Sequence, residues 1–316
     1  MRSIAVINQK GGVGKTVTAV HLAAGLARYG RRVLLIDLDP QAHASLHFGV
    51  QLSGEQPSLY DTLVHGAPLA DAMRSVTERL ALLPGSIDLV GVDLELHQRD
   101  QREGILAGAL AAYRDAFEYC LIDCPPSLGL LTVNALAAVE EVIIPLQPHF
   151  LALQGLGRLL ETVELARQSL NPRLRVSGIV LCLYEKSTRL AQEVLDDITQ
   201  FLRHADTDAP WHGARVFETK IRRSIKLAEC PSFGQTVFDY APGSHGAEDY
   251  LALTREVLDG WEHGATAPVS VPLEAVGAPR GVSPALAAEP PARVARTVSA
   301  GAAVAGIPAR EERSTA

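Results

Sequence analysis

The sequence predicts an α/β protein with a doubly wound, mostly parallel sheet that carries helices on both faces. Short apolar runs of strand length alternate with longer amphipathic runs up to about residue 264. Strands that are apolar throughout are typical of a sheet buried on both faces, and helices between strands supply the crossovers that parallel pairing needs. The chain has 316 residues, 47% hydrophobic and 21% charged, which suits a globular protein with a sizeable core.

The elements follow from these runs in chain order. The apolar runs predict strands at Ser3–Asn8, Val33–Asp37, Leu80–Pro84, Tyr119–Asp123, Glu141–Leu146 and Val176–Leu183. The amphipathic runs predict helices at Thr16–Tyr29, Ile105–Phe117, Gly129–Ala138, Leu153–Ser169, Arg189–His204 and Ala247–Glu262.

The composition changes after residue 264. Residues 265–316 are rich in Ala, Pro, Gly and Val and contain no aromatic residue. Such a segment cannot bury enough apolar surface to offset the entropy lost on ordering. We therefore expect one folded domain over residues 1–264 and a disordered Ala/Pro-rich tail over residues 265–316. Prolines interrupt each stretch of the tail that could form a membrane-binding helix, so we expect no stable membrane association.

Charge and cysteine content limit the possible functions. The formal net charge is -7, so binding to nucleic acid would need a local basic patch. No apolar run approaches the roughly 20 residues that span a bilayer. No leader-like segment precedes the first strand and no C-x-x-C pair occurs, so we expect reduced thiols and a cytoplasmic protein. The cysteines are Cys120, Cys124, Cys182 and Cys230.

A glycine-rich loop between the first strand and the first helix is the strongest motif. It reads Lys10-Gly11-Gly12-Val13-Gly14-Lys15-Thr16 and is followed by Val17. Glycines let backbone N–H groups approach phosphates closely, and the helix N-terminus favours negative charge. In this context, strand then loop then helix, the motif predicts a phosphate-binding loop, or P-loop. Lys15 should contact the β- and γ-phosphates, and the Thr16 hydroxyl should hold Mg²⁺.

The P-loop departs from the ordinary pattern at its start. Gln9 stands where a glycine is usual, and an extra lysine, Lys10, precedes the paired glycines. In this the sequence resembles the ParA/MinD family of deviant Walker-A P-loop ATPases, and the ParA/Soj-type partition ATPases in particular. The resemblance implies a P-loop NTPase fold and hydrolysis of ATP with Mg²⁺. It also implies a homodimer that forms on ATP binding, in which Lys10 reaches the partner's nucleotide as a trans-acting cation.

Acidic residues end two of the predicted strands. Asp37 and Asp39 follow the second strand, and Asp123 ends the fourth, at the edge where ligands bind in open α/β sheets. By resemblance Asp39 organises the attacking water and lies at the metal, and Asp123 holds Mg²⁺, through water. Asp37 supports either the Mg²⁺ or the P-loop indirectly. The alternative for both acids of the second strand is that they only cap the following turn.

The resemblance extends over most of residues 1–262. Arg222 and Ser224 occupy positions where ParA proteins often have proline and asparagine near the adenine, so we expect both at the nucleotide. Further segments resemble the family in the same order along the chain. They are Pro145–Gln147, Leu153–Leu156, Thr188–Ala191, Leu227–Gly234, Tyr240–Pro242 and Ser244–Ala247.

Basic residues near Lys220–Lys226 form the tightest positive cluster. Family resemblance implies a dimer that holds DNA without sequence preference, segregates chromosome or plasmid DNA, and is stimulated by a ParB-type activator; the protein would then be nucleoid-associated. Phosphate contacts would fit such a role, although a solvated charged face is an equal alternative. The residues assigned to DNA are Arg189, Arg222, Arg223 and Lys226.

Three other functions are compatible with parts of the pattern. A ParA-like ATPase can position a protein cargo, and a MinD-type septum-site regulator shares the P-loop. An iron-sulfur electron-transfer ATPase would need two well-separated cysteines at a dimer axis. Cys120 and Cys124 are too close together for that, and Cys120 lies inside a predicted buried strand.

Overall fold

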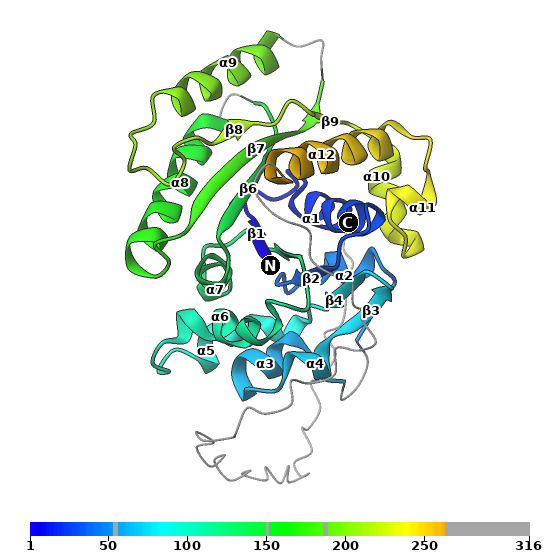
Figure 1. Cartoon of the computed structure of the whole chain (residues 1–316), viewed down its shortest axis with the longest axis vertical. Helices are drawn as coiled ribbons and strands as arrows, with labels where there is room; N and C mark the ends of the chain where they lie inside the picture. The colour runs from blue at the N-terminus through cyan, green and yellow to red at the C-terminus, as the bar shows by residue number, and fades with distance from the viewer. Residues whose placement is uncertain (53–55, 150–151, 186–188, 263–316) are drawn as a thin grey trace, which may run out of the picture. The chain divides into compact units, whose positions relative to one another are not determined.

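The central sheet of this computed structural model is mostly parallel, as the sequence predicts (Figure 1). The structure describes residues 1–52, 56–149, 152–185 and 189–262, so the predicted tail lies outside the described residues. Within them, the sheet has nine strands. Eight follow the order β3-β4-β2-β5-β1-β6-β7-β8, and the ninth, β9, pairs with β7. Only β3 runs antiparallel to its neighbour among these described pairs. The strands are β1 Arg2–Val6, β2 Val33–Asp37, β3 Arg74–Thr77, β4 Leu80–Leu83, β5 Tyr119–Asp123, β6 Glu141–Leu146, β7 Arg175–Tyr184, β8 Arg215–Val216 and β9 Ile221–Arg222.

Helices cover both faces of the sheet. The largest are α1 Lys15–Arg28, α7 Leu130–Ala138, α8 Ala152–Ser169, α9 Arg189–Arg203 and α12 His245–Glu262. No helix in the described part of the chain is long and apolar enough to cross a membrane. Shorter helices are α2 His43–Leu46, α3 Leu59–His65, α4 Leu69–Ala72, α5 Val92–Glu95, α6 Ile105–Leu110, α10 Ile225–Glu229 and α11 Val237–Tyr240.

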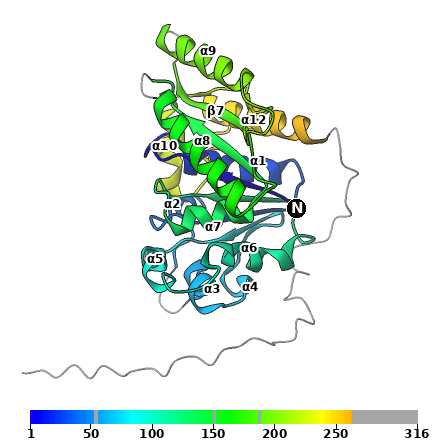
Figure 2. The same ribbon diagram turned by 90° about the vertical axis from the view of Figure 1, so that its left-hand side faces the viewer.

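Side chains of each central strand alternate between two hydrophobic cores. Ile4 and Val6 of β1 pack with α1 and α12 on one face. Ala5 and Ile7 pack with α7 and α8 on the other face. Figures 1 and 2 show these two helix layers on opposite sides of the strands. Because α1 follows β1 on one face and α7 follows β5 on the other, the chain winds in two directions from the centre of the sheet.

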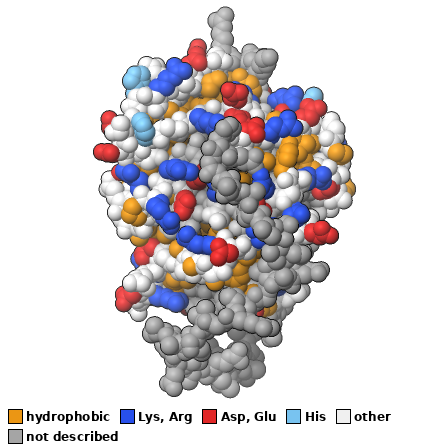
Figure 3. Space-filling view, in the orientation of Figure 1, with side chains coloured by type: hydrophobic (Ala, Val, Ile, Leu, Met, Phe, Trp, Pro, Cys, Tyr) orange, Lys and Arg blue, Asp and Glu red, His pale blue; other side chains and the backbone are white. Residues whose placement is uncertain are grey.

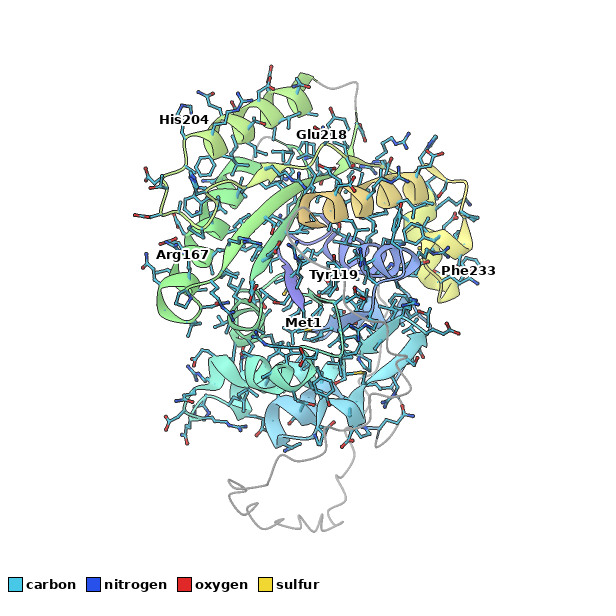
Figure 4. The ribbon with its side chains drawn as sticks, viewed as in Figure 1. Met1, Tyr119, Arg167, His204, Glu218 and Phe233 are labelled. Carbon is cyan, nitrogen blue, oxygen red and sulfur yellow. The ribbon has the colours of Figure 1, made fainter. Side chains whose placement is uncertain are left out.

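Strand register brings the predicted acids to one edge. Asp37 pairs in register with Asp123, and Val6 pairs with Asp123 from the other side. The carboxyl ends of β2, β5 and β1 therefore meet directly below the start of the P-loop. In Figure 4, Tyr119 at the amino end of β5 lies near the middle of the sheet, whereas His204 and Phe233 lie at the periphery.

Two kinds of prediction differ from the structure. The helix predicted over Ile105–Phe117 is wrong in its second half, because α6 ends at Leu110 and a 3₁₀ turn, Ala111–Tyr113, follows. The chain must turn there to reach Glu118, whose N–H donates to the Arg32 carbonyl at the start of the sheet. The strands β3, β8 and β9 were not predicted from the sequence, because they are too short and polar to show strand periodicity.

Candidate nucleotide-binding site

The P-loop, Lys10–Thr16, wraps from β1 into α1 with left-handed backbone at two glycines. Gly12 has φ 74° and Gly14 has φ 96°, which side-chain-bearing residues rarely adopt. Gly14 caps α1, and its carbonyl accepts a hydrogen bond from the Thr18 N–H. The free N–H groups of the first helical turn follow directly, so the loop forms the N-terminal anion site that the motif predicts.

Lys15 is a buried cation at the start of α1. Its side chain is largely shielded, and Nζ donates a hydrogen bond to the Lys10 carbonyl at 3.1 Å. Burial lowers the pKa of Lys15, while the nearby Asp123 and Asp39 oppose the shift. Neighbouring carboxylates therefore keep a desolvated ammonium in place at the mouth of the P-loop.

Asp123 is an orphaned carboxylate at the end of β5. The side chain is fully buried, and neither oxygen has a hydrogen-bond partner among the described residues. Burial, followed by the negative charge of Asp37, raises the pKa of Asp123 well above its usual range. The Thr16 hydroxyl and Lys15 offset part of this shift, although Thr16 makes no hydrogen bond of ordinary length to either oxygen.

Asp37 and Asp39 differ in their surroundings. Asp37 is fully buried, and its Oδ2 accepts hydrogen bonds from the N–H and hydroxyl of Ser45, both at 2.7 Å. Burial raises the pKa of Asp37 to about 6. Asp39 lines the cavity described below, and its Oδ1 accepts a hydrogen bond from the Gln41 N–H at 2.9 Å. Asp37 therefore braces the turn, and Asp39 faces the site.

These donors suit a hard divalent cation. Thr16 offers a hydroxyl, and Asp123 offers two buried oxygens without partners. Within the described ranges, no three His, Cys, Asp or Glu side chains gather as a metal cage. Such a sparse set fits Mg²⁺, which usually keeps several waters and takes one or two carboxylates plus substrate phosphates.

A cavity of about 470 Å³ opens beside the P-loop, and its lining has a polar part and an apolar part. Gly11, Gly12, Gly14, Lys15, Thr16 and Val17 form the phosphate end, with Asp39. Arg222 and Ser224, which the sequence analysis predicts at the nucleotide, also line the cavity. Lys10, Val13 and Asp123 are not part of the wall, since Lys10 is exposed and the side chains of Val13 and Asp123 are buried. The rest of the lining is mostly apolar and comprises Cys182, Leu183, Ile221, Leu227, Ala228 and Tyr250, of which Cys182 lies against Gly14 of the P-loop.

The apolar part of the cavity lining, including Leu183 and Tyr250, was not predicted from the sequence. Leu183 at the end of β7 has φ 53°, a strained backbone for a leucine, of the kind that gathers at functional sites. Tyr250 reaches the cavity from α12, and its hydroxyl lies 3.1 Å from that of Thr18 in α1. Neither residue belongs to a motif with fixed spacing from the P-loop; the path of β7 brings Leu183 to the cavity, and the packing of α12 on α1 brings Tyr250 there.

Arg222 is held at the cavity rim by carboxylates. Its Nε and Nη2 both donate to the largely buried Asp249, and its backbone N–H donates to the same carboxylate at 2.9 Å. Nη2 also donates to Glu248 at 3.2 Å. This bidentate arrangement fixes the guanidinium and neutralises its charge, which favours the predicted nucleotide role of Arg222 over its predicted DNA role.

The other predicted DNA contacts are also paired. Arg223 lies 3.2 Å from Glu185, and Lys226 lies 2.8 Å from Glu229. The structure gives no side-chain description for Arg189, the first residue of α9. Together with the Arg222 pairs, three cations meet four carboxylates, so this cluster is not a strongly positive patch in the single chain. On the face seen in Figure 3, basic side chains likewise lie among acidic ones.

All four cysteines are buried as free thiols. Burial raises the pKa of Cys120 and of Cys182 to about 12. A cluster shared between two subunits needs thiolates that reach the subunit surface. The burial of these side chains therefore argues against the iron-sulfur alternative.

The parallel sheet, the P-loop between β1 and α1, and the acids at neighbouring strand ends define a P-loop NTPase of the deviant Walker-A class. Residues 1–176 match the family described as AAA domain. The chromosome partitioning protein ParA of Myxococcus xanthus is 41% identical over 258 residues, which are 81% of this chain and 88% of the relative. The sporulation initiation inhibitor protein Soj of Bacillus subtilis is 42% identical over 255 residues, which are 80% and 97%.

Solved structures agree with this fold. Cobyrinic acid a,c-diamide synthase from Mycobacterium smegmatis, with bound ADP and magnesium, superposes with a TM-score of 0.70 at 34% identity over 86% of this chain and 100% of that chain. The septum site-determining protein MinD from Pyrococcus horikoshii, complexed with Mg-ADP, gives a TM-score of 0.63 at 27% identity, with 82% and 97% covered. The chain belongs to the ParA/MinD family of P-loop ATPases, and its similarity to relatives named ParA and Soj confirms the predicted resemblance.

Proposed function

We propose that this protein binds ATP with Mg²⁺, closes into a homodimer, and in that state holds DNA until a ParB-type partner stimulates hydrolysis. Asp123 is the single observation that carries the nucleotide half of this proposal. A fully buried carboxylate without a hydrogen-bond partner is costly unless a cation compensates it. Its neighbours Thr16 and Lys15 are the groups that a bound Mg²⁺ and nucleotide phosphates require.

Each polar residue of the site has a distinct role in this proposal. Lys15, already buried at the phosphate end, holds the β- and γ-phosphates, and Thr16 and Asp123 hold the cation, Asp123 through water. The Mg²⁺ neutralises charge on the phosphates when bound. Asp39, which faces the cavity, orients the attacking water near the metal. Solved structures of similar proteins support a nucleotide with Mg²⁺ as the ligand, because the synthase was crystallised with ADP and magnesium and MinD with Mg-ADP.

Lys10 carries the dimer half of the proposal. Its side chain is exposed beside the cavity but does not line it, so it does not contribute to the nucleotide site of its own chain. An exposed cation at the mouth of a phosphate site can instead meet the phosphates of a second copy that faces it. Two copies arranged in this way would each complete the other's site.

The relatives support DNA segregation as the purpose of the cycle. Proteins named for chromosome partitioning match over four fifths of this chain. We propose Arg223 as the main DNA contact, with Lys226 and Arg189 as further contacts. Both members of the Arg223–Glu185 pair are more than half exposed, and exposed pairs contribute little stability. A DNA phosphate can therefore replace Glu185 at small cost. In the cell this activity places the protein in the cytoplasm, at the nucleoid.

Co-sedimentation with non-specific DNA under ATP, ADP and no nucleotide tests this proposal. We expect binding only with ATP, and we expect Lys15→Ala to abolish both ATP binding and DNA binding. Arg223→Ala should keep the ATP dimer but weaken DNA binding and lower its salt dependence. Arg173→Ala is a matched control, because Arg173 has the same 63% side-chain exposure and an ion pair with Glu140. Equal DNA binding in all three nucleotide conditions would contradict a nucleotide switch and would leave only the ATPase fold.

A further inference from the structure

Lys10 is held at three atoms in the single chain. Its N–H donates to Asn8 Oδ1 at 3.0 Å, and its carbonyl accepts from Lys15 Nζ at 3.1 Å. Its own Nζ lies 2.6 Å from Nε2 of His149. Asn8 in turn donates to the Pro145 carbonyl at 2.8 Å. Two contacts thus tie the start of the P-loop to β6 and the chain just after it: Asn8 contacts Pro145 in β6, and Lys10 contacts His149 beyond it.

The contact with Lys10 fixes the tautomer of the His149 imidazole. An ammonium group has only donors, so Nε2 must accept and the ring proton must sit on Nδ1. His149 is only partly exposed, and its carbonyl accepts from the N–H of Ala152 at the start of α8. The backbone of His149 is therefore held by this hydrogen bond, and its ring faces a lysine that does not line this chain's own cavity.

We propose that His149 is a positioning residue for Lys10, holding the ammonium beside its own P-loop in the free chain and releasing it when the ATP dimer forms. This inference rests on the proposed role of Lys10 at the partner's nucleotide. ATP binding would draw Lys15 from the Lys10 carbonyl toward the phosphates and so remove one of the three anchors. A partner's phosphate is then a charged acceptor, and it competes well against a neutral imidazole.

Release of Lys10 has a measurable electrostatic consequence. Burial lowers the pKa of His149, and the positive charge of Lys10 lowers it further. When Lys10 leaves, the second cause disappears and the pKa should rise toward the ordinary value of about 6.5. The dimer then binds protons more tightly than the free chain does, so by linkage dimerisation should strengthen as the pH falls from 8 to 6.

NMR titration of the His149 ring, assigned by its loss in His149→Gln, tests the contact directly. In the free full-length chain we expect a pKa below the ordinary value of about 6.5, and a higher value in Lys10→Ala. Adding a non-hydrolysable ATP analogue with Mg²⁺ should raise the pKa in the wild type, on a sample whose dimerisation is followed by sedimentation. An unchanged pKa in Lys10→Ala would show that the contact does not exist in solution and would overturn the proposal.

Dimer affinity at two pH values supplies the second readout. We expect the wild-type dimer to be about tenfold tighter at pH 6 than at pH 8, since two histidines gain protons. His149→Gln keeps a neutral acceptor without a titrating group, so it should lose this pH dependence, and His204→Gln should keep it. His149→Ala should dimerise about threefold to tenfold more tightly at pH 8, because one hydrogen bond no longer holds Lys10 back.

The outcomes separate this inference from the proposed function. A wild-type dimer that forms while the pKa of His149 stays constant would overturn the release of Lys10 and leave the ATP switch intact. A weaker dimer in His149→Ala would also overturn it, because His149 would then assist the dimer contact. Absence of any ATP dimer would contradict the proposed function together with this inference.

Discussion

Two buried carboxylates at the ends of neighbouring strands cost the nucleotide-free chain stability. Burial raises the pKa of Asp37 to about 6 and that of Asp123 well above its usual range. A raised pKa means that the folded state binds these protons more tightly than the unfolded state does. For Asp37, the resulting stability is present below pH 4 and is lost as the pH rises through about 6. The two buried carboxylates therefore lower the stability of the nucleotide-free chain at neutral pH, and in the proposed function a bound cation offsets this loss.

Asp123→Asn should stabilise the nucleotide-free protein at pH 7.5 while abolishing its response to the ligand. Removing a buried carboxyl group that has no hydrogen-bond partner should raise the melting temperature by about 2 °C or more. The further rise that Mg²⁺ and ATP give the wild type should disappear, because the cation loses a ligand. Thermal melts with and without Mg-ATP measure both effects, with the exposed Asp100→Asn as control. A variant that melts several degrees lower and still responds to Mg-ATP would contradict this account of Asp123.

Asp39→Ala should separate binding from turnover. The P-loop is untouched in this variant, so ATP binding and dimerisation should persist. Hydrolysis should fall about a hundredfold or more, because no carboxylate would orient the water. Steady-state phosphate release and nucleotide affinity, measured on the same sample, check the two halves. Turnover at the wild-type rate would leave Asp39 with only its structural hydrogen bond to Gln41.

At the scale of elements, the long apolar strands and the P-loop were predictable, because periodicity and glycine spacing are local properties. The strands β3 and β9 were not, since both are too short to show strand periodicity, and the partner of β9, β7, also lies far away in the chain. The same limit applies to the site. Arg222 was found through family resemblance, but its carboxylate partner Asp249 and the cavity residue Tyr250 come from α12. His149 was missed entirely, because only the fold places it against Lys10.

Gly85 joins β4 to the acidic edge, and its missing side chain is a requirement of the packing. A Cβ at Gly85 would lie 2.9 Å from the backbone oxygens of both Asp37 and Asp39. Gly85→Ala should therefore displace the turn that carries both acids. We expect about 1–3 kcal/mol lower stability and weaker Mg-ATP binding. Denaturant unfolding and ATP titration measure these effects. Gly104→Ala is the matched control, since nothing lies within 4 Å of a Cβ there; equal behaviour of the two variants would contradict the packing argument.

At the scale of the whole molecule, the proposed dimer would compensate for the weak DNA-binding surface of the single chain. Arg222, Arg223 and Lys226 are each paired with a carboxylate, so this part of one chain offers only a weak surface for DNA. A rigid pair of such surfaces binds more tightly, because the second contact forms at high effective concentration after the first. ATP control over dimerisation then becomes ATP control over DNA binding. In the proposed cycle, Lys10 is the residue on which this coupling depends.

Salt-dependent DNA binding by Lys10→Ala, with ATP occupancy and sedimentation measured on the same samples, tests this claim most directly. Lys10 does not line its own cavity, so the variant should bind ATP with affinity close to that of the wild type. It should nevertheless remain monomeric and bind DNA at least about tenfold more weakly, although no proposed DNA contact has changed. A Lys10→Ala protein that dimerises with ATP and binds DNA like the wild type would contradict the switch.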